Sequence, residues 1–187
     1  MGMFIGLAPF IAFFVLMRLA SPLAGLVAGL IVSALLMVRM RLRGESIKIL
    51  ELGSLALFAA LVLYTLVAAP IWTVARVRLA VDSGLLAIVI VSLAIGRPFT
   101  LQYARERVSR QYWNSPRFIA TNRLITAVWA VAFAVLVATD AAAEYAPAVP
   151  LWVDIAAAIV AFLGAVGFTL WYPAATRPAE SVAGRSG

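Results

Sequence analysis

Four ionisable side chains lie within or beside long apolar segments and are the first candidates for chemistry: Arg18, Glu51, Asp82 and Asp154. Charges are costly to bury in a membrane, so residues of this kind often mark ion or proton paths. Structural pairing is the alternative, because Glu51 follows Lys48 by three residues on what would be one helix face. Asp82 follows Arg78 by four residues and can pair in the same way. No acid falls clearly at mid-membrane, so the sequence favours structural roles over a path linking Asp82 and Asp154.

The segment between Gly96 and Leu124 contains six arginines, several aromatic residues and a single acid, Glu106. Guanidinium groups next to interfacial aromatic rings are suited to hold anionic lipid headgroups or to dock a partner protein. The same charge would arise in an ordinary cytoplasmic loop, because such loops are enriched in Lys and Arg. The candidate binding residues are Arg97, Arg105, Arg107, Arg110, Trp113 and Arg117.

The chain contains no cysteine and no histidine. Disulfides, thiolate chemistry, histidine-bound metals and a Ser-His-Asp triad are therefore excluded. We expect no enzymatic activity, no cofactor and no metal. The net charge of +7 would suit a nucleic-acid-binding protein, but the basic residues cluster at the ends of apolar runs, as topology signals do. We therefore expect membrane lipids, in particular anionic ones, as partners, and no nucleic acid.

Composition indicates what surrounds these candidates. The 187 residues are 65% hydrophobic and 12% charged, with a mean hydropathy of +1.04, whereas a soluble domain is about 45–50% apolar and about 25% charged. The apolar runs are continuous instead of alternating, which favours helices over a membrane barrel. The sequence therefore predicts an all-α, polytopic transmembrane helical bundle.

The apolar runs predict five full spans and one short N-terminal membrane segment. The segment at 4–17 is too short for a full span, so it either crosses or re-enters, and this decides the side of the amino terminus. The basic stretch at 97–115 is predicted to lie along the cytoplasmic headgroups, and Asp140 and Glu144 to lie in an outer loop. A mobile cytoplasmic tail follows at 177–187. The spans are expected at 19–38, 50–69, 79–96, 116–139 and 152–172.

Small residues recur every four positions in the first full span, at Ser21, Gly25, Gly29 and Ser33. They share one helix face and would let another backbone approach closely. This pattern predicts helix packing but leaves the oligomeric state open.

The order of parts is also informative. A short apolar amino terminus with Ala8-Pro9-Phe10 precedes a basic loop, two spans, Gly96-Arg97-Pro98 and a further span containing Trp129-Ala-Val-Ala-Phe133. This order resembles the intracellular septation protein A family over almost the whole chain. The family commonly has an asparagine three residues before the tryptophan, where this chain has Thr126 and has Asn122 a heptad before the tryptophan.

The resemblance implies a bacterial inner-membrane protein with a non-enzymatic role in cell-envelope maintenance or division. The positive charge of the two basic loops predicts that these loops and the carboxyl terminus face the cytoplasm. On this hypothesis the chain is a scaffold that contacts lipid or partner proteins through its basic loop. The alternatives are a small transporter or channel, or an accessory subunit of a larger membrane complex.

Overall fold

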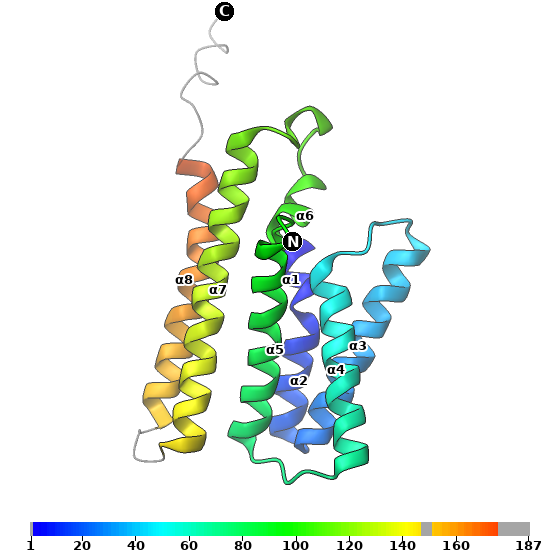
Figure 1. Ribbon diagram of the computed structural model, residues 1–187, viewed down its shortest axis with the longest axis vertical. Helices are drawn as coiled ribbons and strands as arrows, with labels where there is room; N and C mark the ends of the chain where they lie inside the picture. Colours follow the sequence, from blue (N-terminus) through cyan, green and yellow to red (C-terminus); the bar gives the residue numbers. More distant parts are fainter. Residues whose placement is uncertain (1, 147–150, 176–187) are drawn as a thin grey trace, which may run out of the picture.

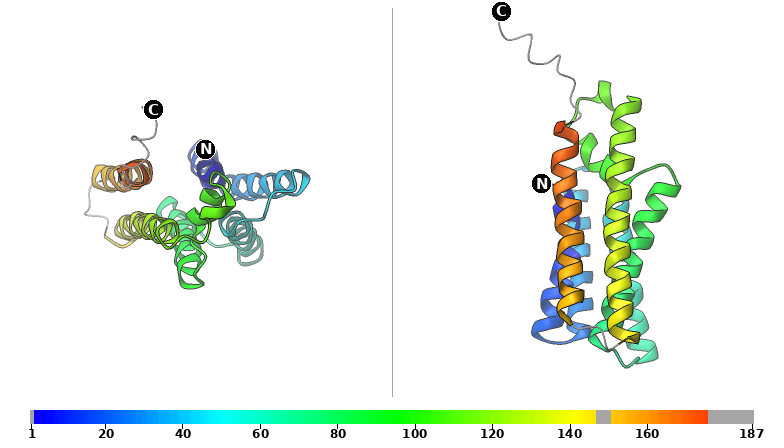
Figure 2. Two further views of the ribbon diagram at one scale, coloured as in Figure 1. Left: turned by 90° about the horizontal axis from the view of Figure 1, so that it is seen from above. Right: turned by 90° about the vertical axis from the view of Figure 1, so that its left-hand side faces the viewer.

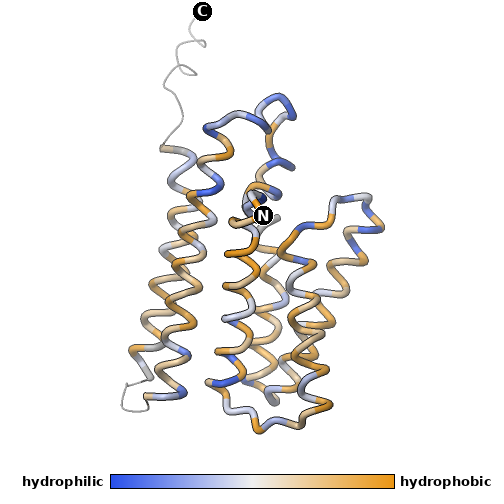
Figure 3. Tube along the Cα trace, in the orientation of Figure 1, coloured by the Kyte–Doolittle hydropathy of each residue, from blue (hydrophilic) through white to orange (hydrophobic). Residues whose placement is uncertain are grey.

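The computed structural model describes residues 2–146 and 151–175, which form helices and connecting turns, with no strand among them (Figure 1). Five of the helices are long and apolar enough to cross a membrane, which confirms the predicted class of polytopic helical membrane protein. They are α3 (Pro22–Leu42), α4 (Ile49–Ala68), α5 (Val74–Ala94), α7 (Pro116–Tyr145) and α8 (Leu151–Ala175). Figure 3 shows hydrophilic residues gathered toward the two ends of the bundle and apolar residues between them. The predicted tail at 177–187 lies outside the described residues.

The amino-terminal segment consists of α1 (Gly2–Gly6) and α2 (Ala8–Leu19), which meet at Leu7. Leu7 keeps a right-handed helical conformation, with φ −88° and ψ −6°. The combined segment is about 27 Å long at 1.5 Å per residue, close to the roughly 30 Å of a hydrocarbon core. In Figure 1 it runs from the end of the bundle that carries α6 (Phe99–Arg105) to the opposite end. The segment thus passes along the bundle instead of turning back, and Gly2 lies at the α6 end.

The helices pack in the order α2, α3, α4, α5, α7 and α8. Seen from above, they form an arc with α2 and α8 at its two ends (Figure 2). α8 packs mainly against α7, and only 6% of its apolar span is buried, against 22–33% for the other spans. The outer face of α8 is therefore left to lipid or to another protein.

The small-residue stripe of α3 is occupied within the chain. A Cβ atom on Gly25 would lie 2.7 Å from the carbonyl oxygen of Phe13 and 2.8 Å from Cβ of Met17. Gly29 faces the Phe58 ring of α4, which in turn packs against Phe13. Ser21 caps the amino end of α3 by accepting a hydrogen bond from the Ala24 N–H at 3.1 Å, and Ser33 is buried. The stripe brings α2 and α4 close to α3.

Several helix boundaries differ from the hydropathy-based spans. The span predicted at 19–38 is α3 at Pro22–Leu42, since Leu19 still belongs to α2 and Ser21 caps the start of α3. α7 continues through Asp140 and Glu144 to Tyr145, so these acids lie in a helix and not in an outer loop. α5 begins at Val74, where Thr73 caps it by accepting from the Arg76 N–H at 3.0 Å. The charged residues in the first turns of α5 and the last turns of α7 form ion pairs with each other, which explains why both helices extend beyond their apolar runs. Ser115 caps the start of α7 by accepting a hydrogen bond from the Phe118 N–H.

Gly25→Ala tests this packing. The added methyl group meets backbone of α2, which cannot rotate away, and we expect a loss of about 1–3 kcal/mol in unfolding free energy. SDS titration of the purified protein in mixed micelles measures the change. Gly164→Ala is the matched control, because a Cβ atom at this α8 glycine has open space around it. Equal stability of the two variants would contradict the assigned contact between α2 and α3.

Candidate functional site

The candidate site is built around α6, which packs against one end of the bundle. Gly96 ends α5 with a positive φ of 71°, a conformation that favours glycine and lets the chain reverse. The side chains of Phe99, Leu101 and Tyr103 are then buried against the bundle. The basic stretch was predicted to lie along the headgroups, but its first part is anchored inward by these apolar side chains.

Hydrogen bonds fix α6 to two long helices. The Thr100 hydroxyl donates to the Asn122 carbonyl oxygen at 2.9 Å and lies 2.7 Å from the Thr126 hydroxyl. The Gln102 side-chain oxygen accepts from the Ile49 N–H at 2.8 Å and so satisfies an otherwise unpaired donor at the start of α4. The site is therefore built on bonded elements at the point where α5 ends.

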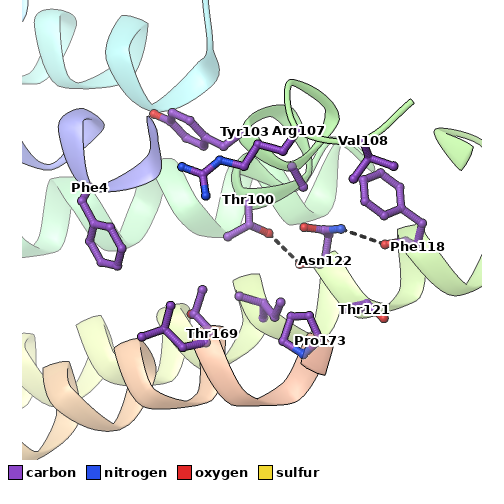
Figure 4. Close-up of a pocket in the computed structure, with 13 residues that line it drawn as sticks. Phe4, Thr100, Tyr103, Arg107, Val108, Phe118, Thr121, Asn122, Thr169 and Pro173 are labelled. Carbon is purple, nitrogen blue, oxygen red and sulfur yellow. Dashed lines mark hydrogen bonds between the residues drawn. The ribbon is translucent and has the colours of Figure 1, made fainter. Parts of the chain in front are cut away.

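A cavity of about 410 Å³ lies between α6, α7, α8 and Phe4 (Figure 4). Its wall is mostly apolar, with hydroxyl and amide groups from Thr100, Thr169 and Asn122. The side chain of Arg107 reaches toward Phe4 and Thr100 in Figure 4. Among the side chains that the structure describes, no carboxylate forms an ion pair with Arg107. The cavity therefore presents a cationic group beside apolar space, the chemistry that an anionic amphiphile needs.

Behind the cavity lies a polar cluster that joins α6 to α4. The Tyr103 hydroxyl donates to Glu51 Oε1 at 2.7 Å, and both residues are buried. Burial and the neighbouring Glu51 carboxylate raise the pKa of Tyr103, so the phenol keeps its proton and acts as the donor. Lys48 pairs with Glu106 at 2.8 Å, and its Nζ atom lies 5.1 Å from the Tyr103 ring centroid. The acid that pairs with Lys48 is thus Glu106 of the α6 cap, in place of the predicted Glu51.

The other predicted basic residues divide into two groups. Arg105 and Arg110 lie over the Trp113 ring, at 5.6 and 5.7 Å from its centroid, and the indole donates to the Val108 carbonyl oxygen. These three side chains form one surface beside the cavity. Arg97 and Arg117 are exposed and lie outside both the cavity wall and the tryptophan contact.

At the opposite end of the bundle, α5 and α7 share buried charge. Arg78 pairs with Asp140 at 2.5 Å, with only 11% and 0% of their side chains exposed. Asp82, one turn further along α5, is also buried, about 12 Å from the start of the helix. Nearer the helix ends, Arg76 pairs with Glu144 at 2.5 Å, where the arginine is half exposed.

The sequence analysis placed Asp140 in an outer loop, because its charge follows the end of an apolar run, and so did not predict it as a site residue. One feature of the sequence does indicate that Asp140 has a basic partner. Arg76 and Arg78 break the positive-inside pattern, which implies acidic partners nearby. Asp140 and Glu144, four residues apart on one helix face, are suited to supply them. Among the other candidates, Arg18 is exposed in the last turn of α2, and the side chain of Asp154 lies outside the described residues.

No family model, curated protein or solved structure matches the chain. The fold and the site define its class: a multi-pass helical membrane protein with a buried ion pair between α5 and α7 at one end and an arginine-bearing cavity at the other.

Asp140→Asn should destabilise the protein strongly, because it removes the buried carboxylate that pairs with the Arg78 guanidinium, and breaking a buried ion pair typically costs about 3–5 kcal/mol. Glu144→Gln is the matched control, and its half-exposed pair should contribute at most about 1 kcal/mol. SDS titration in mixed micelles measures both variants. A loss for Asp140→Asn no larger than that for Glu144→Gln would show that the buried pair does not hold α5 to α7.

Proposed function

We propose that the chain is a non-enzymatic inner-membrane scaffold that binds anionic phospholipid at its basic, cytoplasmic face. The Arg107 guanidinium beside the apolar cavity carries this proposal. A phosphate can accept charge-assisted hydrogen bonds from this group while an acyl chain fills the apolar space. Arg105, Trp113 and Arg110 extend the same face and supply contacts to further headgroups or to a partner protein.

The cellular role follows from the resemblance to the intracellular septation protein A family. A scaffold in envelope maintenance or division needs a fixed orientation and a surface for lipid or proteins, and no reaction. The distribution of charge supports an orientation with the α6 end in the cytoplasm of a bacterial cell. Arginines are frequent at that end, whereas Arg76 and Arg78 at the other end are neutralised by α7 acids.

A small transporter or channel is the second candidate. The buried charges Arg78, Asp82 and Asp140 favour it, because intramembrane ionisable groups commonly serve ion or substrate paths. An accessory role in a larger complex is supported by the sparsely packed α8, whose exposed face would suit a partner helix.

Arg107→Gln should weaken phosphatidylglycerol binding about tenfold, since a hydrogen bond to a charged group contributes about 1.5–3 kcal/mol. Native mass spectrometry of the detergent-solubilised protein with phosphatidylglycerol and phosphatidylcholine measures the retained lipid. Arg43→Gln removes the same charge from an exposed position at the end of α3 and serves as the control. An equal loss in both variants would point to diffuse surface charge and reject the cavity.

The orientation can be tested with single cysteines, because the chain has none of its own. Ile71→Cys, in the exposed α4–α5 connection, should react with an impermeant maleimide in spheroplasts. Ser46→Cys, in the exposed α3–α4 connection, and Gly2→Cys should react only after lysis. The reverse pattern would place the basic face outside the cytoplasm and overturn the proposed orientation.

A further inference from the structure

We propose that a second cavity at the α6 end binds the headgroup of a phospholipid that carries a primary amine. This cavity lies between α1, α3, α4 and α6 and has a volume of about 150 Å³. Tyr103 is the one residue of its described wall that also lines the Arg107 cavity. The proposal concerns a different wall and a different headgroup, so it does not depend on the proposed scaffold function.

Glu51 supplies the acceptor for the amine. It lies in the first turn of α4, lines the cavity and is only 4% exposed. Its Oε1 atom accepts the Tyr103 hydrogen bond, whereas no donor in the described part of the chain reaches its Oε2 atom. Buried carboxylate oxygens are normally hydrogen-bonded, because an unpaired one loses the hydration that it has in water. An ammonium N–H is the kind of donor that this oxygen lacks.

The other charged side chains of the wall indicate a ligand of mixed charge. Lys48 lines the same cavity, but its ammonium group pairs with Glu106 at 2.8 Å, so these two charges balance each other. Arg39 and Glu45 are exposed, and neither forms an ion pair with a side chain that the structure describes. Together with Glu51, the wall thus offers carboxylates and a guanidinium to a ligand. A molecule with an ammonium and a phosphate complements both signs, whereas a simple cation or anion complements only one.

The position of the cavity suits a lipid headgroup. Arg39 lies in the last turn of α3 and Glu51 in the first turn of α4, where two apolar spans end. The connection between these helices lies at the same end of the bundle as α6 (Figure 1). Leu36 joins the cavity wall and Leu35 beside it is exposed, so acyl chains can stay in the bilayer against α3 while the headgroup enters. The volume is below the roughly 300–1,000 Å³ of pockets for drug-sized ligands, which favours a headgroup over a whole lipid.

Phosphatidylethanolamine and phosphatidylcholine provide the decisive comparison, because both carry a phosphate and an ammonium but only the first has N–H donors. Native mass spectrometry of the purified protein in detergent should show phosphatidylethanolamine retained about tenfold better, the factor that a hydrogen bond to a charged group supplies. Glu51→Gln keeps an acceptor for Tyr103 but puts an amide N–H₂ in place of the second oxygen, and it should remove this preference. Glu144→Gln, which removes a carboxylate at the opposite end, should leave it unchanged. Equal retention of the two lipids by the unaltered protein, or an unchanged preference in a folded Glu51→Gln variant, would overturn the proposal.

Two exposed arginines of α3 keep the test clear if Glu51→Gln fails to fold. Arg39 lines the cavity and Arg43, which caps the end of α3, does not. Arg39→Gln should lower phosphatidylethanolamine retention about tenfold, whereas Arg43→Gln should leave it unchanged. An equal loss in both variants would show that the lipid binds to diffuse surface charge and not in the cavity.

Free phosphoethanolamine distinguishes a lipid from a soluble amine as the ligand. It should displace phosphatidylethanolamine only at much higher concentration, because it lacks the acyl chains that lie against α3. Displacement at equal concentration would overturn the assignment to a phospholipid.

Discussion

A charge placed in hydrocarbon needs a partner, and the Arg78–Asp140 pair shows how this constraint shapes the half of the bundle opposite α6. It requires α5 to begin before Arg78 and α7 to continue past Asp140, so both helices extend beyond their apolar runs. It also sets the two helices side by side at a fixed register, which the half-exposed Arg76–Glu144 pair continues. α8 then packs on the far side of α7, and its contact is completed by the Trp129 indole, which donates to the Thr169 hydroxyl at 2.9 Å.

The class and the main spans could be predicted from the sequence because they depend on average properties. A run of about twenty apolar residues is long enough to cross a membrane as a helix. The row of small residues on α3 allows another helix backbone to pack closely against it. The sequence did not show which helix packs there, since Gly25 could contact a second copy of the protein as well as α2. The structure assigns it to Phe13 and Met17 of the same chain.

The sites were harder to predict, because each depends on a partner distant in the sequence. Lys48 and Glu51 have the spacing of a helical pair, yet Lys48 lies just before α4 and pairs with Glu106. Hydropathy treats Asp140 as the end of a span, since it records the cost of the charge and not the guanidinium that offsets it. Arg107 was one of six similar arginines in the sequence, and only the fold of α6 distinguishes it from Arg97 and Arg117.

Tyr103 shows how the end of the bundle that carries α6 depends on this fold. Its hydroxyl binds Glu51 of α4, its ring lies beneath Lys48, and it also forms part of the cavity that Arg107 faces. Gly6 of α1 lies so close to the Tyr103 hydroxyl that a larger residue there would displace it. The amino-terminal segment, α4 and the cavity are therefore joined through one side chain. Because Tyr103, Glu51 and Lys48 are buried against each other, a ligand that shifts α6 at the cavity must also move the contacts that hold α1 and α4.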